Sequence, residues 1–145
     1  MAEFVFDTEA IIACLHAESG HESVATILTD VFDGEATGSL SKANASEVFH
    51  LVARFEGTAD DAPTTASLRD ADRDLRALKR RGLQLRTPSW HLVRECKAVG
   101  DISLADANAV ALAAEHNATL VLGANDGFDD LALDVELSRF RTGAV

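Results

Sequence analysis

The chain has 145 residues, 47% of them apolar, which is enough for one domain with its own core and no disulfide or structural metal. It has no run of 18 or more apolar residues that could cross a bilayer, and its start lacks the basic and apolar segments of a signal peptide. We therefore expect a single cytoplasmic domain over residues 1–145, without membrane association.

The net charge of −11 arises from 24 acidic and 13 basic residues, and only three of the basic residues are lysines. This composition resembles that of proteins from salt-accumulating halophiles. At about 1 M salt the Debye length is only about 3 Å, so the repulsion between this charge and an anionic partner is largely screened. The charge therefore does not exclude RNA, although any single acid in so acidic a chain is weak evidence of function.

The first half of the chain predicts alternating strands and helices. Phe4–Phe6 is a β-prone run that ends at Asp7, and Ala36–Leu40 is a second. Apolar residues at helical spacing predict three helices, over Thr8–Glu18, Glu22–Phe32 and Ser41–Phe55.

The second half continues this alternation after a loop at Gly57–Thr65. Further helices are predicted over Ala66–Arg81, Ser89–Ala98 and Ser103–His116. Strands are predicted over Leu83–Arg86 and Thr119–Leu122, with a last edge strand within Ala132–Phe140. The alternation predicts an α/β fold of three layers, α/β/α, with a central, mostly parallel sheet of four to five strands.

The cysteines and histidines do not form a pattern typical of zinc or redox sites. Cys14 and Cys96 lie in predicted helices without C-x-x-C spacing, so we expect buried thiols. The five histidines are scattered and show no paired spacing.

Two acids in the first half are candidate metal ligands. Asp7 directly follows the first strand, where the sites of parallel sheets form, although an Asp there is also a good helix cap. Glu47 lies at the margin of an apolar helical stripe, beside Val48 and one turn before Leu51. It either points toward the protein or reaches water.

Two acids in the second half join them. Asp106 lies in the first turn of the alanine-rich helix, where it also suits the helix dipole. Asp126 follows the strand at Thr119–Leu122, within an Asn-Asp-Gly sequence that also favours a turn. Together the four acids indicate a pocket of oxygen ligands, which suits Mg²⁺ or Mn²⁺.

Three segments resemble the PIN-domain family, and within it the VapC-type toxin ribonucleases. FVFDTEAII resembles the family's opening strand, SKANASEVFHL its Glu-bearing helix, and DISLADANAVALAAEHNATLVLG its Asp-bearing helix and the next strand. By this resemblance Asp7, Glu47 and Asp106 match the catalytic, metal-binding acids. Thr8 matches the accessory hydroxyl residue that often follows the first Asp.

The fourth acid departs from the family's pattern, which is a polar residue after the strand, then an Asp, then two residues before an aromatic. Counted forward from the strand, this Asp falls on Ala124; counted back from Phe128, it falls on Asn125. Asp126 fits if the loop is one residue longer, and we prefer it because its side chain is ionised. Asn125 remains its rival.

The resemblance implies an endoribonuclease of the toxin–antitoxin type that depends on Mg²⁺ or Mn²⁺ and hydrolyses RNA phosphodiester bonds. It also implies a cognate antitoxin and a homodimer. Two alternatives stay open. One is a PIN-like module that binds RNA or protein without cleavage, which the irregular fourth acid favours. The other is a housekeeping RNA-processing nuclease.

A row of arginines gives a candidate RNA-binding surface. Arginines recur at helical spacing along one stripe of the predicted helix at Ala66–Arg81: Arg69, Arg73, Arg76 and Arg80. The stripe could instead be a solvated face paired with Asp72 and other acids. Trp90 offers a candidate stacking surface, although a sole Trp more often lies in a core or an interface.

Overall fold

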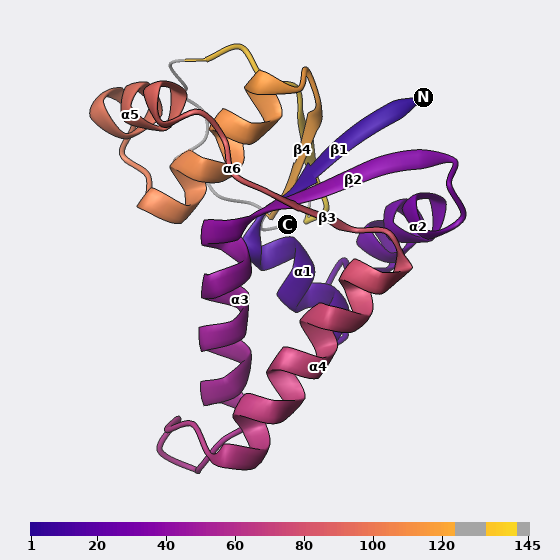
Figure 1. Cartoon of the computed structure of the whole chain (residues 1–145), viewed down its shortest axis with the longest axis vertical. Coiled ribbons are helices and arrows are strands. Elements are labelled where there is room, and N and C mark those ends of the chain that lie inside the picture. Colours follow the sequence, from indigo (N-terminus) through magenta and orange to yellow (C-terminus); the bar gives the residue numbers. More distant parts are fainter. Residues whose placement is uncertain (124–132, 142–145) are drawn as a thin grey trace.

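The computed structural model describes residues 1–123 and 133–141 of the chain (Figure 1). Its strands are β1 (Ala2–Phe6), β2 (Ala36–Ser41), β3 (Gln84–Arg86), β4 (Thr119–Leu122) and β5 (Leu137–Arg139). Its helices are α1 (Thr8–Leu15), α2 (His21–Phe32), α3 (Lys42–Phe55), α4 (Thr65–Arg81), α5 (Trp90–Val99) and α6 (Leu104–Glu115).

The strands form one sheet in the order β3-β2-β1-β4-β5, and every pair is parallel. At the centre, Val5 of β1 pairs with Ser39 of β2 on one side and with Leu120 of β4 on the other. The predicted α/β fold is confirmed, with a sheet that is wholly parallel where a mostly parallel one was expected. The carboxyl ends of the three central strands therefore meet at one edge of the sheet.

Two hydrophobic cores lie on the two faces of the sheet. Phe6 and Val121 pack into the core under α1 to α4, whereas their neighbours Val5 and Leu120 pack into the core under α5 and α6. Successive side chains of a strand point to opposite faces, and both faces here are covered. The predicted three-layer arrangement follows from this alternation.

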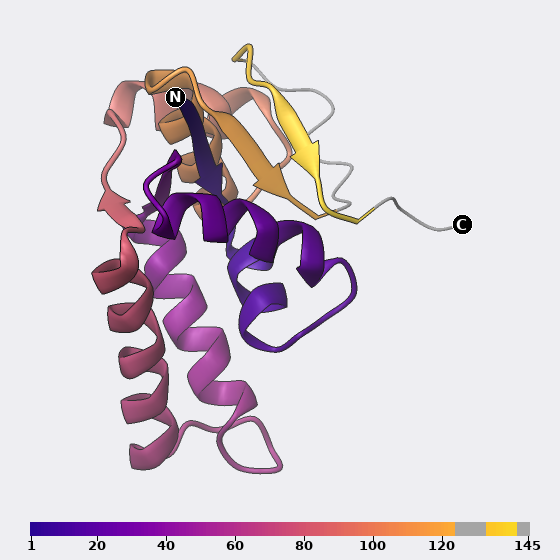
Figure 2. The same ribbon diagram turned by 90° about the vertical axis from the view of Figure 1, so that its right-hand side faces the viewer.

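Helices α3 and α4 run side by side and extend beyond the sheet as a long hairpin (Figures 1 and 2). Helix α4 begins at a capping box formed by Thr64 and Ser67 and ends at Gly82, whose φ of 128° few other residues adopt. The loop before it agrees with the predicted one.

The boundaries and the cysteines differ from expectation in small ways. Helix α1 ends at Leu15, before the predicted Glu18, because Ala17 takes a left-handed conformation with φ of 51°. Both cysteines are free; Cys96 is buried and Cys14 only partly so.

None of the helices within residues 1–123 and 133–141 combines the length and apolar character that a membrane crossing requires.

Candidate functional site

An acidic cavity of about 330 Å³ lies where the first turns of α1 and α6 meet α3. Its walls come from Asp7, Thr8, Glu9, Ile12, Glu47, Leu51, Ser103 and Asp106. The structure thus brings together three of the four acids that the sequence singled out, although 99 residues separate Asp7 from Asp106. We call this space the acidic cavity.

Asp7 is the most buried of these acids, with 3% of its surface exposed. It is also the cap of α1, since its Oδ1 accepts a hydrogen bond of 2.7 Å from the backbone N–H of Ala10. Burial raises the pKa of Asp7 to about 7, and the carboxylates of Glu9, Asp106 and Glu47 add to the rise. Asp7 thus combines the capping role with a crowded, desolvated carboxyl group.

Asp106 and Glu47 face Asp7 from the other two helices. The N–H of Asp106 donates to Ser103 Oγ over 3.1 Å, which fixes the first turn of α6. Burial raises the pKa of Asp106, the Ser103 hydroxyl opposes this rise, and the charge of Glu47 adds to it. Glu47 is half-buried and lines the acidic cavity.

Thr8 belongs to a buried polar network that joins α1 to α3. Its Oγ1 accepts a hydrogen bond of 3.0 Å from Asn44 Nδ2, while the backbone N–H of Asn44 donates to Ser41 Oγ over 3.0 Å. The Ser41 hydroxyl also donates to Asn44 Oδ1. Since Asp7 precedes Thr8 and Glu47 lies one turn after Asn44, this network holds the two acids' backbones together.

The sequence analysis missed Ser41 and Asn44 as site residues, and it also missed Glu9. Ser41 was readable as a helix cap, and Asn44 stands at the third helical position, where a polar residue often completes a cap. Glu9 lies in the first turn of α1, where an acid is expected for the helix dipole alone.

The donor set fits a hard divalent cation in its chemistry, because it offers only carboxylate and hydroxyl oxygens. A cation with six waters of roughly 30 Å³ each fills about 180 Å³, and the cavity measures about 330 Å³. However, no three His, Cys, Asp or Glu side chains in the described part of the chain lie close enough to hold a metal directly. A bound ion would have to keep several waters or draw the carboxylates inward.

The remaining predicted residues lie elsewhere. Asp126 and Asn125 fall outside the described residues. The stripe of arginines lies on the exposed side of α4, and half of it pairs with acids of the same helix: Arg73 with Asp70 at 3.1 Å and Arg76 with Asp72 at 2.8 Å. Helix α4 leads into the amino end of β3, whereas the acidic cavity lies at the carboxyl ends of the strands. RNA contact by this stripe of arginines stays a prediction.

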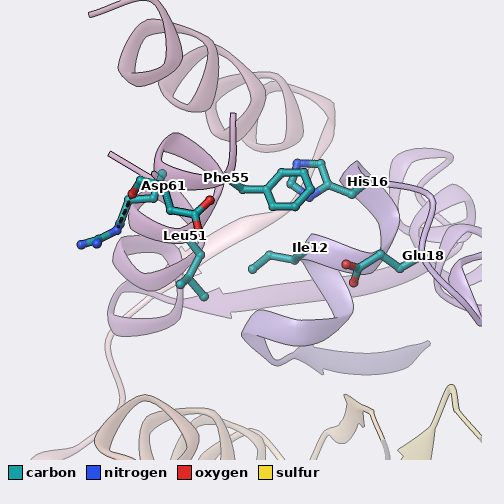
Figure 3. Close-up of a pocket in the computed structure, with 7 residues that line it drawn as sticks. Ile12, His16, Glu18, Leu51, Phe55 and Asp61 are labelled. Atoms are coloured by element: carbon teal, nitrogen blue, oxygen red, sulfur yellow. Dashed lines mark hydrogen bonds between the residues drawn. The ribbon is translucent and has the colours of Figure 1, made fainter. Parts of the chain in front are cut away.

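A second cavity, of about 400 Å³, lies between α1 and α3 and adjoins the acidic one through Ile12 and Leu51 (Figure 3). The ring of Phe55 lies 4.7 Å from that of His16, yet Phe55 remains 67% exposed. Arg54 Nε donates to the backbone oxygen of Asp61 over 3.0 Å and closes one end. We call this space the apolar cavity.

Together these features define a three-layer α/β/α domain whose carboxylates gather at the carboxyl edge of a parallel sheet. The sequence matches the PIN domain over residues 4–133, and the chain belongs to this family. PIN domains are in general nucleases.

Two solved structures share this fold. One is the crystal structure of VapBC2 from Rickettsia felis bound to a DNA fragment from their promoter, with a TM-score of 0.67 and 14% identity over 94% of this chain and 98% of that one. The other is FitAB bound to an IR36 DNA fragment, with a TM-score of 0.62 and 17% identity over 94% of each chain. At these identities the likeness concerns the fold. A comparison with curated proteins gave no match.

Proposed function

We propose that this PIN domain is an endoribonuclease of the toxin–antitoxin type that uses Mg²⁺ or Mn²⁺ to hydrolyse RNA. The observation that carries the proposal is the convergence of Asp7 at the start of α1, Glu47 of α3 and Asp106 of α6 onto one cavity. Family membership supports nuclease activity, and the likeness to VapBC2 and FitAB supports the toxin class.

In this proposal Asp7, Glu47 and Asp106 hold the cation. A divalent cation bound there would acidify a water and offset the charge that develops on the scissile phosphate. The carboxylate of Asp7 is held by its hydrogen bond from Ala10, and the backbone of Asp106 is held by the Ser103 cap. The hydroxyl of Thr8 is tied to Asn44, which supports a positioning role.

A protein partner, such as the cognate antitoxin, is part of the proposal. Leu51 and Phe55 are 41% and 67% exposed, and they line the apolar cavity beside the acidic one. Exposed apolar side chains that gather at a hollow are typical of a protein interface. VapBC2 is, by its description, a complex bound to promoter DNA, and we propose an equivalent partner here. A homodimer and an RNA substrate remain parts of the proposal that follow from the family resemblance.

The experiment is RNA cleavage by the wild type and by Asp7→Asn in molar salt with Mn²⁺, because a chain of net charge −11 is best kept folded at high salt. Asn is as good a helix cap as Asp, so the variant should fold. We expect Mn²⁺-dependent cleavage by the wild type and at least a hundredfold loss in the variant. Equal cleavage by both proteins would contradict the proposal.

A second candidate is a PIN-like module that binds RNA or protein without cleaving. The observation that favours it is that no three acids in the described part of the chain lie at ligating distance. A wild type that binds neither Mn²⁺ nor Mg²⁺ in a calorimetric titration would support this candidate. A housekeeping RNA-processing nuclease would show the cleavage but no antitoxin partner.

A further inference from the structure

Glu9 lies on the wall of the acidic cavity together with Asp7, Glu47 and Asp106. It stands in the first turn of α1, two residues after Asp7. Glu9 therefore shares one cavity with all three acids of the predicted metal site.

The carboxylate of Glu9 packs against Gly123, the buried residue that directly follows β4. A Cβ built on Gly123 would overlap both oxygens and the carboxyl carbon of Glu9. The glycine is thus what makes room for this carboxylate. Glu9 therefore lies at the carboxyl end of β4.

Arg141 fixes the position of Glu9. Its Nη1 binds Glu9 Oε1, its Nη2 lies 3.1 Å from Glu18 Oε1, and its Nε donates to the backbone oxygen of Ser19 over 3.0 Å. Three separate acceptors hold the planar guanidinium, which is more than a simple surface ion pair provides. The ion pair with Arg141 uses Oε1 of Glu9 and does not involve Oε2.

We propose that Glu9 supplies the fourth carboxylate of the divalent-metal site, held there by Arg141 and admitted by Gly123. The inference rests on the proposed function, because it assigns a ligand to the same cavity. Arg141 is the positioning residue, and its positive charge offsets part of the crowding among four carboxylates. The remaining oxygen of Glu9 then serves the cation.

The test is calorimetric titration of Mn²⁺ into wild type, Glu9→Gln and the matched control Glu18→Gln in molar salt. Both variants remove one carboxylate partner of Arg141, but only Glu9 lines the acidic cavity. We expect Mn²⁺ to bind Glu9→Gln at least tenfold more weakly than wild type, and Glu18→Gln within twofold of it.

Gly123→Ala gives a second, independent variant, since Gly123 has no positive φ and accepts an alanine backbone. Its Cβ should displace Glu9 and reproduce the tenfold loss, with no further loss when the two changes are combined. Mn²⁺ affinity of Glu9→Gln within twofold of wild type would overturn the inference. So would a tenfold loss in Asp126→Asn alone, which would assign the fourth carboxylate to the loop.

The outcomes separate this inference from the proposed function. If the wild type binds no Mn²⁺, both fail. If the wild type binds Mn²⁺ and loses it in Asp7→Asn but keeps it in Glu9→Gln, the metal site stands and only the role of Glu9 is overturned.

Discussion

The acidic cavity and the apolar cavity are neighbours built from the same two helices, yet their chemistry is opposite. They share Ile12 and Leu51. The acidic cavity lies at the N-terminal ends of α1 and α3, where Asp7 is buried at 3% exposure. The apolar cavity lies toward the C-terminal ends of the same helices, where Phe55 is 67% exposed.

Both regions depart from what stability alone favours, but in opposite directions. A carboxylate is buried in one, and a large aromatic side chain is left in water in the other. Each departure would be relieved by a different ligand: a cation in the acidic cavity, and an apolar surface in the other. Under the proposed function, one helix pair would serve both metal binding and partner recognition.

The largest expected effect concerns the buried charge of Asp7 in the metal-free protein. Its pKa is about 7 in the folded chain against 3.8 in the unfolded chain, so folding favours the protonated form. Its contribution to stability is complete below pH 4 and is lost as the pH rises through 7. Asp7→Asn keeps the cap and removes the charge, so it should raise the free energy of unfolding at pH 8 by up to about 4 kcal/mol. Urea unfolding of both proteins in EDTA at pH 5 and pH 8 measures this difference. If Asp7→Asn raised the free energy of unfolding as much at pH 5 as at pH 8, the buried charge of Asp7 would not be the cause.

The second effect is loss of metal affinity when Glu47 is changed. We expect Glu47→Gln to weaken Mn²⁺ binding about a hundredfold, which is about 2.7 kcal/mol, because it removes a carboxylate from the acidic cavity. Glu56→Gln is the matched control at the other end of the same helix, where Glu56 lies 3.3 Å from His16. Its Mn²⁺ affinity should stay within twofold of wild type. Calorimetry distinguishes the two variants, and a similar loss in both would mean that only total charge matters.

The third effect concerns the polar network beneath the acidic cavity. Asn44→Ala should destabilise the protein by about 1–3 kcal/mol, because it leaves Thr8 and Ser41 without their buried partner. The control is Asn108→Ala, because Asn108 Nδ2 donates to the backbone oxygen of Leu104 within its own helix. Urea unfolding of the two variants should differ by at least 1 kcal/mol. If Asn44→Ala matched the control, the network would not be what joins α1 to α3.

The smallest effect is expected at the apolar cavity. Phe55→Ser should change the free energy of unfolding by less than about 1 kcal/mol, because the side chain of Phe55 is mostly in water. Mn²⁺ affinity should stay within twofold of wild type. Unfolding and titration of this one variant measure both quantities. A loss above 2 kcal/mol would show that Phe55 stabilises the chain itself and that its exposure needs no partner.

Much of the fold could be predicted because its signals are local. Pro88 marks the start of α5, Gly82 the end of α4, and Ser103 the cap of α6, and the structure has all three. Alternation of strands and helices then leaves few arrangements other than a parallel sheet. The convergence of Asp7 and Asp106 could be expected for the same reason, since both stand at helix starts beside the carboxyl edge of this sheet.

The rest of the site depends on contacts between residues that are distant in sequence. Glu9 and Arg141 are 132 residues apart, and no pattern in the sequence connects them. The helix dipole alone explains an acid at Glu9, so the sequence gives no reason to place this side chain on the cavity wall. Asp126 could be named from the resemblance, but it lies outside the described residues.

Helix α4 of the hairpin and the central strands of the sheet should differ in how readily they unfold locally. Of the 17 residues of α4, only Ser67 and Ala71 are buried, whereas the last three residues of β4 are all buried at the centre of the sheet. Leu75 and Leu78 pack against the core, but most of α4 is exposed, so we expect its amide protons to exchange with solvent through local fraying. We expect those of β1 and β4 to exchange only when the whole domain unfolds, and Asp7, which directly follows β1, stands at the end of this protected sheet.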